Sequence, residues 1–177
     1  MSRIPFTSIE QQPEPIRQFM ARHGNLNVFR LLANTPHAFL GWAQMVDELF
    51  DSPTFSLRTR EVIILRVAHL QGSRYELAQH TGLARAAGLT EQQIDAIVGD
   101  GDLDAAGFSS IERTALDVIT ELCTTHRLRD DSFAAARAAL GDEALTELLM
   151  IVSCYYGLAL VVNAGDLEVD ATARFQP

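Results

Sequence analysis

The chain has 177 residues, of which 47% are hydrophobic and 21% are charged, and its formal net charge is −9. This length and composition are typical of a globular protein with a sizeable hydrophobic core. We expect no nucleic-acid partner, because phosphate binding needs clustered positive charge and the sequence is acidic without a basic cluster.

Helical spacing of apolar residues predominates after a polar N-terminal segment. Residues 1–13 are predicted to form an arm, and residues 14–177 a single all-α domain, since no segment alternates like a β-strand. The predicted helices cover residues 15–22, 27–33, 37–50, 57–70, 73–87, 92–98, 109–126, 132–140 and 143–164. Their predicted ends are an N-cap at Ser56, capping boxes opening at Thr90 and Ser109, a glycine cap at Gly88 and a break at Gly141.

The most apolar stretch runs from Leu148 to Val162. As a helix it spans about 22 Å, whereas a membrane span needs about 20 apolar residues, so we predict a core or interface helix and no membrane. Gly157 within it would let a neighbouring helix approach closely. We see no N-terminal secretory signal, and Cys123 and Cys154 stand in no metal or redox spacing, so we expect a cytoplasmic protein with reduced thiols.

Two helices joined at Gln71-Gly72 place ionisable residues on a face that should be buried. At 100° per residue, the outward sector of the second helix contains Arg74, Ala78, Thr81 and Arg85. The predicted inward sector contains Ser73, Glu76, Leu77, His80, Leu83, Ala84 and Ala87. Burying a carboxylate and an imidazole is costly unless the two are paired, so this face is the strongest functional indication in the sequence.

Glu76 and His80 are four residues apart and can touch on one helical face. A carboxylate orients an imidazole and stabilises its charged form, which is the arrangement that a general base or proton relay needs. Glu61, on the preceding helix, could join them, and Arg60 is predicted to face inward. A metal site with His69 or Glu61 as third ligand is the alternative, but no HExxH motif is present and we expect no metal.

These residues resemble a known family. The run from Arg58 to Ile97 is similar to the core of the carboxymuconolactone decarboxylase and alkyl hydroperoxidase D family, and the segments 35–50 and 155–165 also resemble family segments. We take residues 57–98 as the core motif. The matching positions are Glu61, Ser73, Tyr75, Glu76, His80, Ala84 and Gly88.

The resemblance implies an alkyl hydroperoxidase D-like helical bundle that works without a cofactor. It also implies homo-oligomers, trimers or hexamers in the family, with a dimer left open here. In the hydroperoxidase members, two cysteines stand at the positions of Ser73 and Glu76, so this chain belongs with the branch that lacks the CxxC motif. Thiol chemistry needs those cysteines, and the expectation therefore moves to acid–base chemistry.

Three functional hypotheses follow. The first is a decarboxylase-like lyase in which Glu76, His80 and Glu61 carry out decarboxylation or isomerisation of a small unsaturated acid or lactone, with Ser73, Tyr75 and Arg60 binding the substrate. The second is a peroxiredoxin-type oxidoreductase that uses Cys123 or Cys154. The third is a non-catalytic oligomeric scaffold in which the Glu/His cluster is a structural polar network.

Overall fold

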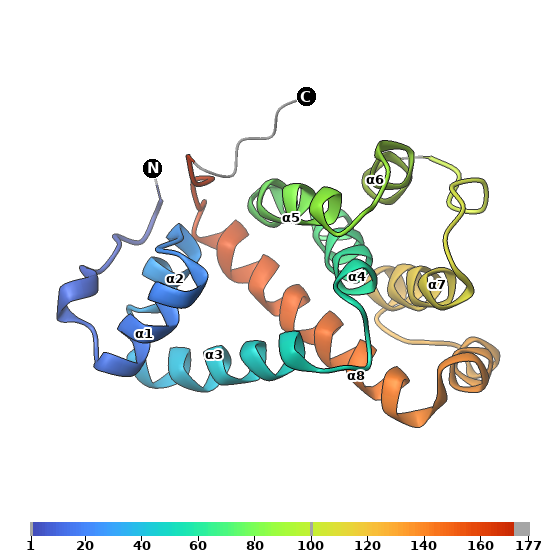
Figure 1. Cartoon of the computed structure of the whole chain (residues 1–177), viewed down its shortest axis with the longest axis horizontal. Helices are drawn as coiled ribbons and strands as arrows, with labels where there is room; N and C mark the ends of the chain where they lie inside the picture. The colour runs from blue at the N-terminus through green and yellow to red at the C-terminus, as the bar shows by residue number, and fades with distance from the viewer. Residues whose placement is uncertain (1, 100, 172–177) are drawn as a thin grey trace.

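The computed structural model describes residues 2–99 and 101–171, and these residues form helices and no strand (Figure 1). The all-α prediction is therefore confirmed. In chain order the elements are η1 (Ile9–Gln11), α1 (Glu14–His23), α2 (Asn27–Leu32), α3 (Pro36–Asp51), α4 (Leu57–Leu70), α5 (Arg74–Ala86), α6 (Glu91–Val98), α7 (Ser110–Thr125) and α8 (Asp130–Ala164).

Helix α4 is the centre of the bundle. Every residue from Thr59 to Ala68 is buried, and the helix packs against α5, α6, α7 and α8. Its apolar residues run around the whole circumference, which is the pattern of a helix enclosed by others. Helices α4 and α5, joined at Gln71-Gly72 as the sequence predicts, pack against each other.

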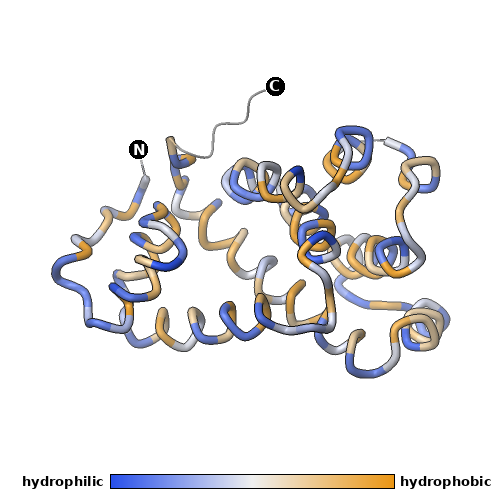
Figure 2. The backbone as a smooth tube through the Cα atoms, viewed as in Figure 1, coloured by the Kyte–Doolittle hydropathy of each residue, from blue (hydrophilic) through white to orange (hydrophobic). Residues whose placement is uncertain are grey.

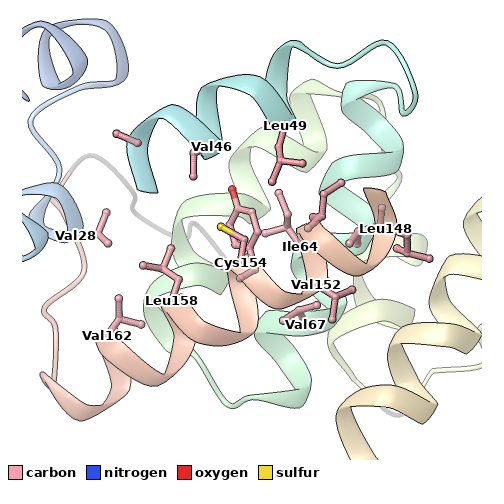
Figure 3. Close-up of a cluster of buried hydrophobic side chains, with 14 of the residues drawn as sticks. Val28, Val46, Leu49, Ile64, Val67, Leu148, Val152, Cys154, Leu158 and Val162 are labelled. Carbon is pink, nitrogen blue, oxygen red and sulfur yellow. The ribbon is translucent and has the colours of Figure 1, made fainter. Parts of the chain in front are cut away.

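Two hydrophobic clusters flank α4. The larger contains Ile64 and Val67 from α4 together with residues of α1, α2, α3, α7 and α8, and Figure 3 shows Val46, Leu49 and Val152 within it. The smaller lies against Val62 and Leu65, and involves α5, α6 and α7. In Figure 2, hydrophobic positions recur along each helix, as expected for amphipathic helices that share a core.

The predicted helix ends are confirmed in detail. Ser56 accepts a hydrogen bond from the Thr59 N–H, and both predicted capping boxes form. Gly88 has φ +91°, a backbone conformation that favours glycine after a helix. Gly141 (φ 78°, ψ 172°) interrupts α8 and separates its first turns from the long helix that follows.

Helix α8 is the one helix among the described residues that is long and apolar enough to cross a membrane by length and composition. Half of its most apolar window is buried within the protein, and core helices of soluble proteins pass the same test. Met150, Leu160 and Val161 remain exposed on its outer face. Among the described residues, nothing lies within 4 Å of a Cβ placed on Gly157, so none of the described helices makes the close approach predicted there.

Two predicted orientations are wrong. Leu83, predicted to face inward, is 46% exposed, and Thr81, predicted to face outward, is 2% exposed. Helix α5 packs against α4, α6 and α8, so its buried arc is wider than one stripe. Thr81 tolerates burial because its hydroxyl donates to the Leu77 carbonyl at 2.7 Å.

The two ends of the described chain meet. The Arg3 N–H donates to the Gly165 carbonyl at 2.8 Å, just past the end of α8. The chain then turns back, and Leu167 packs against the larger cluster. In Figure 1 this C-terminal segment rises beside α2.

Candidate active site

His80 lies between two carboxylates. Its Nδ1 is 2.9 Å from Glu61 Oε2, and its Nε2 is 3.6 Å from Glu76 Oε2. Glu61 comes from α4, and the other two residues come from successive turns of α5. The three residues predicted to be catalytic are therefore gathered at one place; their catalytic role stays a prediction.

The cluster is almost completely removed from solvent, with Glu61, Glu76 and His80 exposed by 0%, 3% and 8%. Burial lowers the pKa of His80, but the charge and hydrogen bond of Glu61 and the charge of Glu76 outweigh it, so the pKa is raised. Burial raises the pKa of Glu76, against the opposing charge of His80. The raised pKa of His80 favours an imidazolium paired with Glu61, and the raised pKa of Glu76 favours its protonated carboxyl group at a pH where an exposed one has lost its proton.

Each carboxyl group keeps one oxygen unpaired. Oε1 of Glu61 and Oε1 of Glu76 are buried and have no hydrogen-bond partner among the described residues. Buried acceptors without a partner are rare, and leaving one unsatisfied costs about 1–3 kcal/mol. These two oxygens are the acceptor positions that a bound molecule with donor groups would satisfy.

Tyr155, on α8, completes the wall of the cluster. Its ring meets the His80 ring edge to face, with centroids 5.3 Å apart. Burial and the negative charges of Glu76 and Glu61 raise the pKa of its phenol far above the ordinary value, so the hydroxyl keeps its proton. No local spacing in the sequence relates Tyr155 to His80.

The three residues predicted to bind substrate are engaged within the chain. Ser73 is the N-cap of α5 and accepts from the Glu76 N–H, which places it beside the cluster. The Tyr75 hydroxyl donates to Asp170 Oδ2 at 2.5 Å and accepts from the Val28 N–H at 3.1 Å. Tyr75 therefore points toward the C-terminal segment and not toward His80.

Arg60 has a structural contact of its own. It donates to the carbonyls of Leu49 and Ser52 at 3.2 and 3.0 Å, at the end of α3. Arg66 is buried too, although the sequence did not predict it to face inward, and it donates to the Ile97 carbonyl. The polar contacts of both arginines are thus made to other parts of the chain.

The two cysteines are buried, and each is a free thiol. Burial raises the pKa of Cys154 to about 11 and also raises that of Cys123. A thiol needs a lowered pKa to act as a nucleophile near neutral pH. Both side chains therefore behave as packing groups.

The main surface hollows lie elsewhere. One, of about 1070 Å³, is lined by α7 and the start of α8, and the other, of about 1000 Å³, lies between α3 and α8. Neither is lined by Glu61, Glu76 or His80. Within the described part of the chain, no group of three His, Cys, Asp or Glu side chains has the geometry to hold a metal ion. Among the described residues, the buried cluster is the candidate site because it combines unpaired acceptors with a proton-carrying imidazole.

Comparison with known proteins agrees with the sequence resemblance. Residues 36–121 match the model of the carboxymuconolactone decarboxylase family. This match spans α3 to most of α7 and includes the whole Glu61, Glu76 and His80 cluster. No curated protein sequence matches the chain significantly.

Several solved structures share the fold. An uncharacterised peroxidase-related protein from Ralstonia eutropha, an alkylhydroperoxidase AhpD core, is 20% identical over 97% of this chain and 94% of its own, with a TM-score of 0.84. A peroxidase-related protein from Silicibacter is 15% identical over 97% and 93%, with a TM-score of 0.81. A cysteine-to-alanine variant of the debrominase Bmp8, bound to 2,3,4-tribromopyrrole, is 14% identical over 98% and 96%, with a TM-score of 0.81. The alkyl hydroperoxidase D-like fold is therefore confirmed.

Proposed function

Since residues 36–121 belong to the carboxymuconolactone decarboxylase family, we propose that this chain is a cofactor-independent acid–base enzyme that decarboxylates or isomerises a small unsaturated acid or lactone. The observation that carries the proposal is the position of His80 between Glu61 and Glu76. A buried imidazolium held by one carboxylate and close to a second, protonated carboxyl group is suited to proton delivery.

The proton path follows from the pKa directions. In a decarboxylation, the bond between the substrate and its carboxylate breaks, carbon dioxide leaves, and the electron pair moves into the unsaturated carbonyl system. The His80 imidazolium gives its Nε2 proton to the resulting carbanion, while Glu61 keeps the ring oriented through Nδ1. Glu76 then returns a proton to His80, and solvent restores that of Glu76.

The charge around the cluster restricts how a substrate faces it. Two carboxyl groups surround one imidazole, and the guanidinium groups of Arg60 and Arg66 make their contacts elsewhere. A carboxylate placed directly on the cluster would meet the Glu61 carboxylate, and the imidazolium charge of His80 is already paired with Glu61. The lactone or enol part of the substrate is therefore the part that faces His80. The complex of the debrominase with 2,3,4-tribromopyrrole, a small unsaturated ring, is compatible with a ligand of this size.

The thiol-based alternative receives less support. Ser73 and Glu76 stand where the hydroperoxidase branch carries its cysteines, and the thiols of Cys154 and Cys123 are buried with raised pKa values. The scaffold alternative is favoured by one observation, the near-complete burial of the cluster. The experiment below separates the three.

The test is turnover of a panel of unsaturated acids and lactones, including carboxymuconolactone, followed by loss of substrate absorbance and release of carbon dioxide. We expect His80→Ala and Glu76→Gln to lower turnover by about 10²–10⁴-fold with unchanged helical content. The matched controls His37→Ala and Glu143→Gln change exposed residues and should retain activity. Full activity in His80→Ala would refute the proposal. Peroxide consumption that disappears when Cys123 and Cys154 are both replaced would favour the oxidoreductase.

Self-association is proposed on separate grounds. The exposed residues Met150, Leu160 and Val161 form an apolar strip on α8, and Gly157 leaves open space beside it. A second copy of the chain would cover this strip. Light scattering of the purified protein measures the particle mass, and a monomer at all concentrations would contradict the proposal.

A further inference from the structure

The carboxylate of Asp170 is held by three donors that come from two helices. Its Oδ2 accepts from the Tyr75 hydroxyl at 2.5 Å and from Gln79 Nε2 at 2.7 Å. The Asn27 N–H donates to Oδ1 at 3.0 Å and to Oδ2 at 3.3 Å. The end of the described chain thus lies against α2 and α5 as a bound carboxylate would.

All three donors are neutral, and one of them is fixed in direction. Because the Tyr75 oxygen already accepts from the Val28 N–H at 3.1 Å, its own proton is directed at the carboxylate. The Tyr75 side chain is 3% exposed, so its hydroxyl stays in place without Asp170. A buried hydroxyl, an amide and a backbone N–H converging on one point bind a carboxylate through charge-assisted hydrogen bonds.

Contacts other than those of the carboxylate also hold the segment that delivers Asp170, among them the hydrogen bond from the Leu167 N–H to the Val162 carbonyl at 3.0 Å. Leu167 packs against the core, and the Glu168 carbonyl accepts from Asn27 Nδ2 at 3.0 Å. The next residue, Val169, is exposed. The Asp170 carboxylate joins this segment to both α2 and α5, so an acid that displaces it would free the end of the segment from both helices.

The donors on α5 adjoin the acid–base cluster. Tyr75 and Gln79 are four residues apart and share one face of the helix, and each directly precedes a member of the cluster, Glu76 and His80. The negative charge of Glu76 is one of the influences on the Tyr75 phenol. A small acid bound by these donors would therefore lie on the face of α5 next to the one that carries Glu76 and His80.

We propose that Tyr75, Gln79 and the Asn27 N–H form a receptor for the carboxylate of a small organic acid, and that Asp170 occupies this receptor as an intrachain ligand until such an acid displaces it. The proposal deepens the proposed function, on which it rests, by naming the residues that would hold the acid group on the neighbouring face of α5, away from the Glu61 carboxylate. Its tests measure binding and not turnover, so either proposal can fail while the other stands.

The first test is rescue by acetate of the variant Asp170→Ala, with Asp95→Ala, an exposed site on α6, as the control. Thermal unfolding is followed while sodium acetate replaces sodium chloride at constant ionic strength. In the wild type, Asp170 occupies the receptor, so the apparent affinity for acetate is reduced in proportion to the fraction of molecules in which the receptor is free. We therefore expect acetate to bind Asp170→Ala about tenfold or more tightly than the wild type. Adding Tyr75→Phe should abolish the gain.

Three outcomes would overturn the receptor proposal. In the first, acetate stabilises Asp170→Ala no more than the wild type. In the second, it stabilises Asp95→Ala as much as Asp170→Ala, and in the third, its extra stabilisation of Asp170→Ala persists when Tyr75→Phe is added. If Asp170→Ala does not fold, the isosteric Asp170→Asn takes its place, and acetate should then stabilise it more than the wild type.

The second test addresses displacement in the unaltered chain. Hydrogen exchange of the segment 166–171 is measured with and without maleate, a small unsaturated dicarboxylate. We expect maleate to accelerate exchange there and to leave α4 unchanged. Maleate binding that does not change exchange in this segment, or no maleate binding at all, would show that Asp170 is a permanent structural contact.

Discussion

Replacing Glu61 by glutamine removes one charge from the buried cluster and little else. The side chain keeps its shape, and its amide oxygen can still accept from His80 Nδ1, which now lies 2.9 Å from the carboxylate. The change therefore isolates the electrostatic part of the pair. Glu112→Gln is the matched control, because Glu112 is equally buried but accepts from Arg58 at 2.8 Å.

The magnitude follows from the kind of hydrogen bond that is lost. A bond to a charged group contributes about 1.5–3 kcal/mol and a neutral one about 0.5–1.5 kcal/mol, so Glu61→Gln should lower the free energy of unfolding by about 1–2 kcal/mol. For a chain of this size, that corresponds to a fall in Tm of about 2–8 °C. The loss should be smaller than for Glu61→Ala, which removes the partner altogether and should cost about 3–5 kcal/mol.

The pH dependence gives the sharper test. The pKa of His80 is raised above its ordinary value in the folded protein, so the contribution of the pair is complete below about pH 6.5 and is lost as the pH rises through the higher folded value. Urea unfolding should show the full difference between wild type and Glu61→Gln at pH 6 and a smaller one at pH 9. The Glu112→Gln difference should stay constant, because an arginine keeps its charge throughout. A Glu61→Gln difference that is constant or grows with pH would refute the reasoning.

Three further changes test other parts of the structure. Burial raises the pKa of Glu76, so the free energy of unfolding of the wild type falls as the pH rises from about 4.5. Measured by urea unfolding, the stability of Glu76→Gln relative to the wild type should therefore increase from pH 5 to pH 8. A variant that is clearly less stable than the wild type at both pH values would favour the scaffold hypothesis. With a pKa of about 11, Cys154 should be less than about 0.1% thiolate at pH 8, and a thiol reagent should label it only after unfolding; fast labelling of the native protein would contradict this. Gly141→Ala should lower the free energy of unfolding by about 1–3 kcal/mol, because its φ of 78° and ψ of 172° suit glycine alone. Gly157 lies within α8 with open space around its Cβ position, so Gly157→Ala should instead stabilise the monomer by about 0.5–1 kcal/mol. Equal effects of the two substitutions would show that the backbone at the break in α8 is unstrained.

The sequence predicts the bundle well because helix ends and periodicity are local properties. Ser56, Thr90 and Ser109 cap the helices where their side chains follow the capping patterns, and Gly141 interrupts α8 where the sequence loses its helical spacing. The predicted orientation of Leu83 is wrong because the width of the buried face of a helix depends on how many helices pack against it. Helix α5 has three, and no periodicity in its own sequence states that number.

At the candidate site, too, the sequence predicts the local contacts and misses the contacts between distant segments. Glu76 and His80 meet because they are one helical turn apart, and Glu61 joins them because the connection between α4 and α5 is short. Tyr155 could not be predicted, since only the packing of α8 on α5 brings it to His80. Tyr75 was expected to serve the site, but a residue near the other end of the chain, Asp170, takes its hydroxyl. The surroundings of Tyr155 and Tyr75 are set by contacts between segments that are far apart in the chain, and the spacing of residues in one sequence does not predict such contacts.

The hydrogen bond between the Arg3 N–H and the Gly165 carbonyl has a practical consequence. It holds the first described residues against the end of α8, so the backbone is nearly a closed ring. Such chains tolerate circular permutation, provided that the new termini fall in an exposed loop. The connection between α6 and α7 is such a loop, since Gly101, Asp102 and Asp104 are exposed there. Opening the ring at that point and joining the old ends by a flexible linker would leave the α4–α5 pair uninterrupted, and would move any fusion partner from the Asp170 side of the molecule to the connection between α6 and α7.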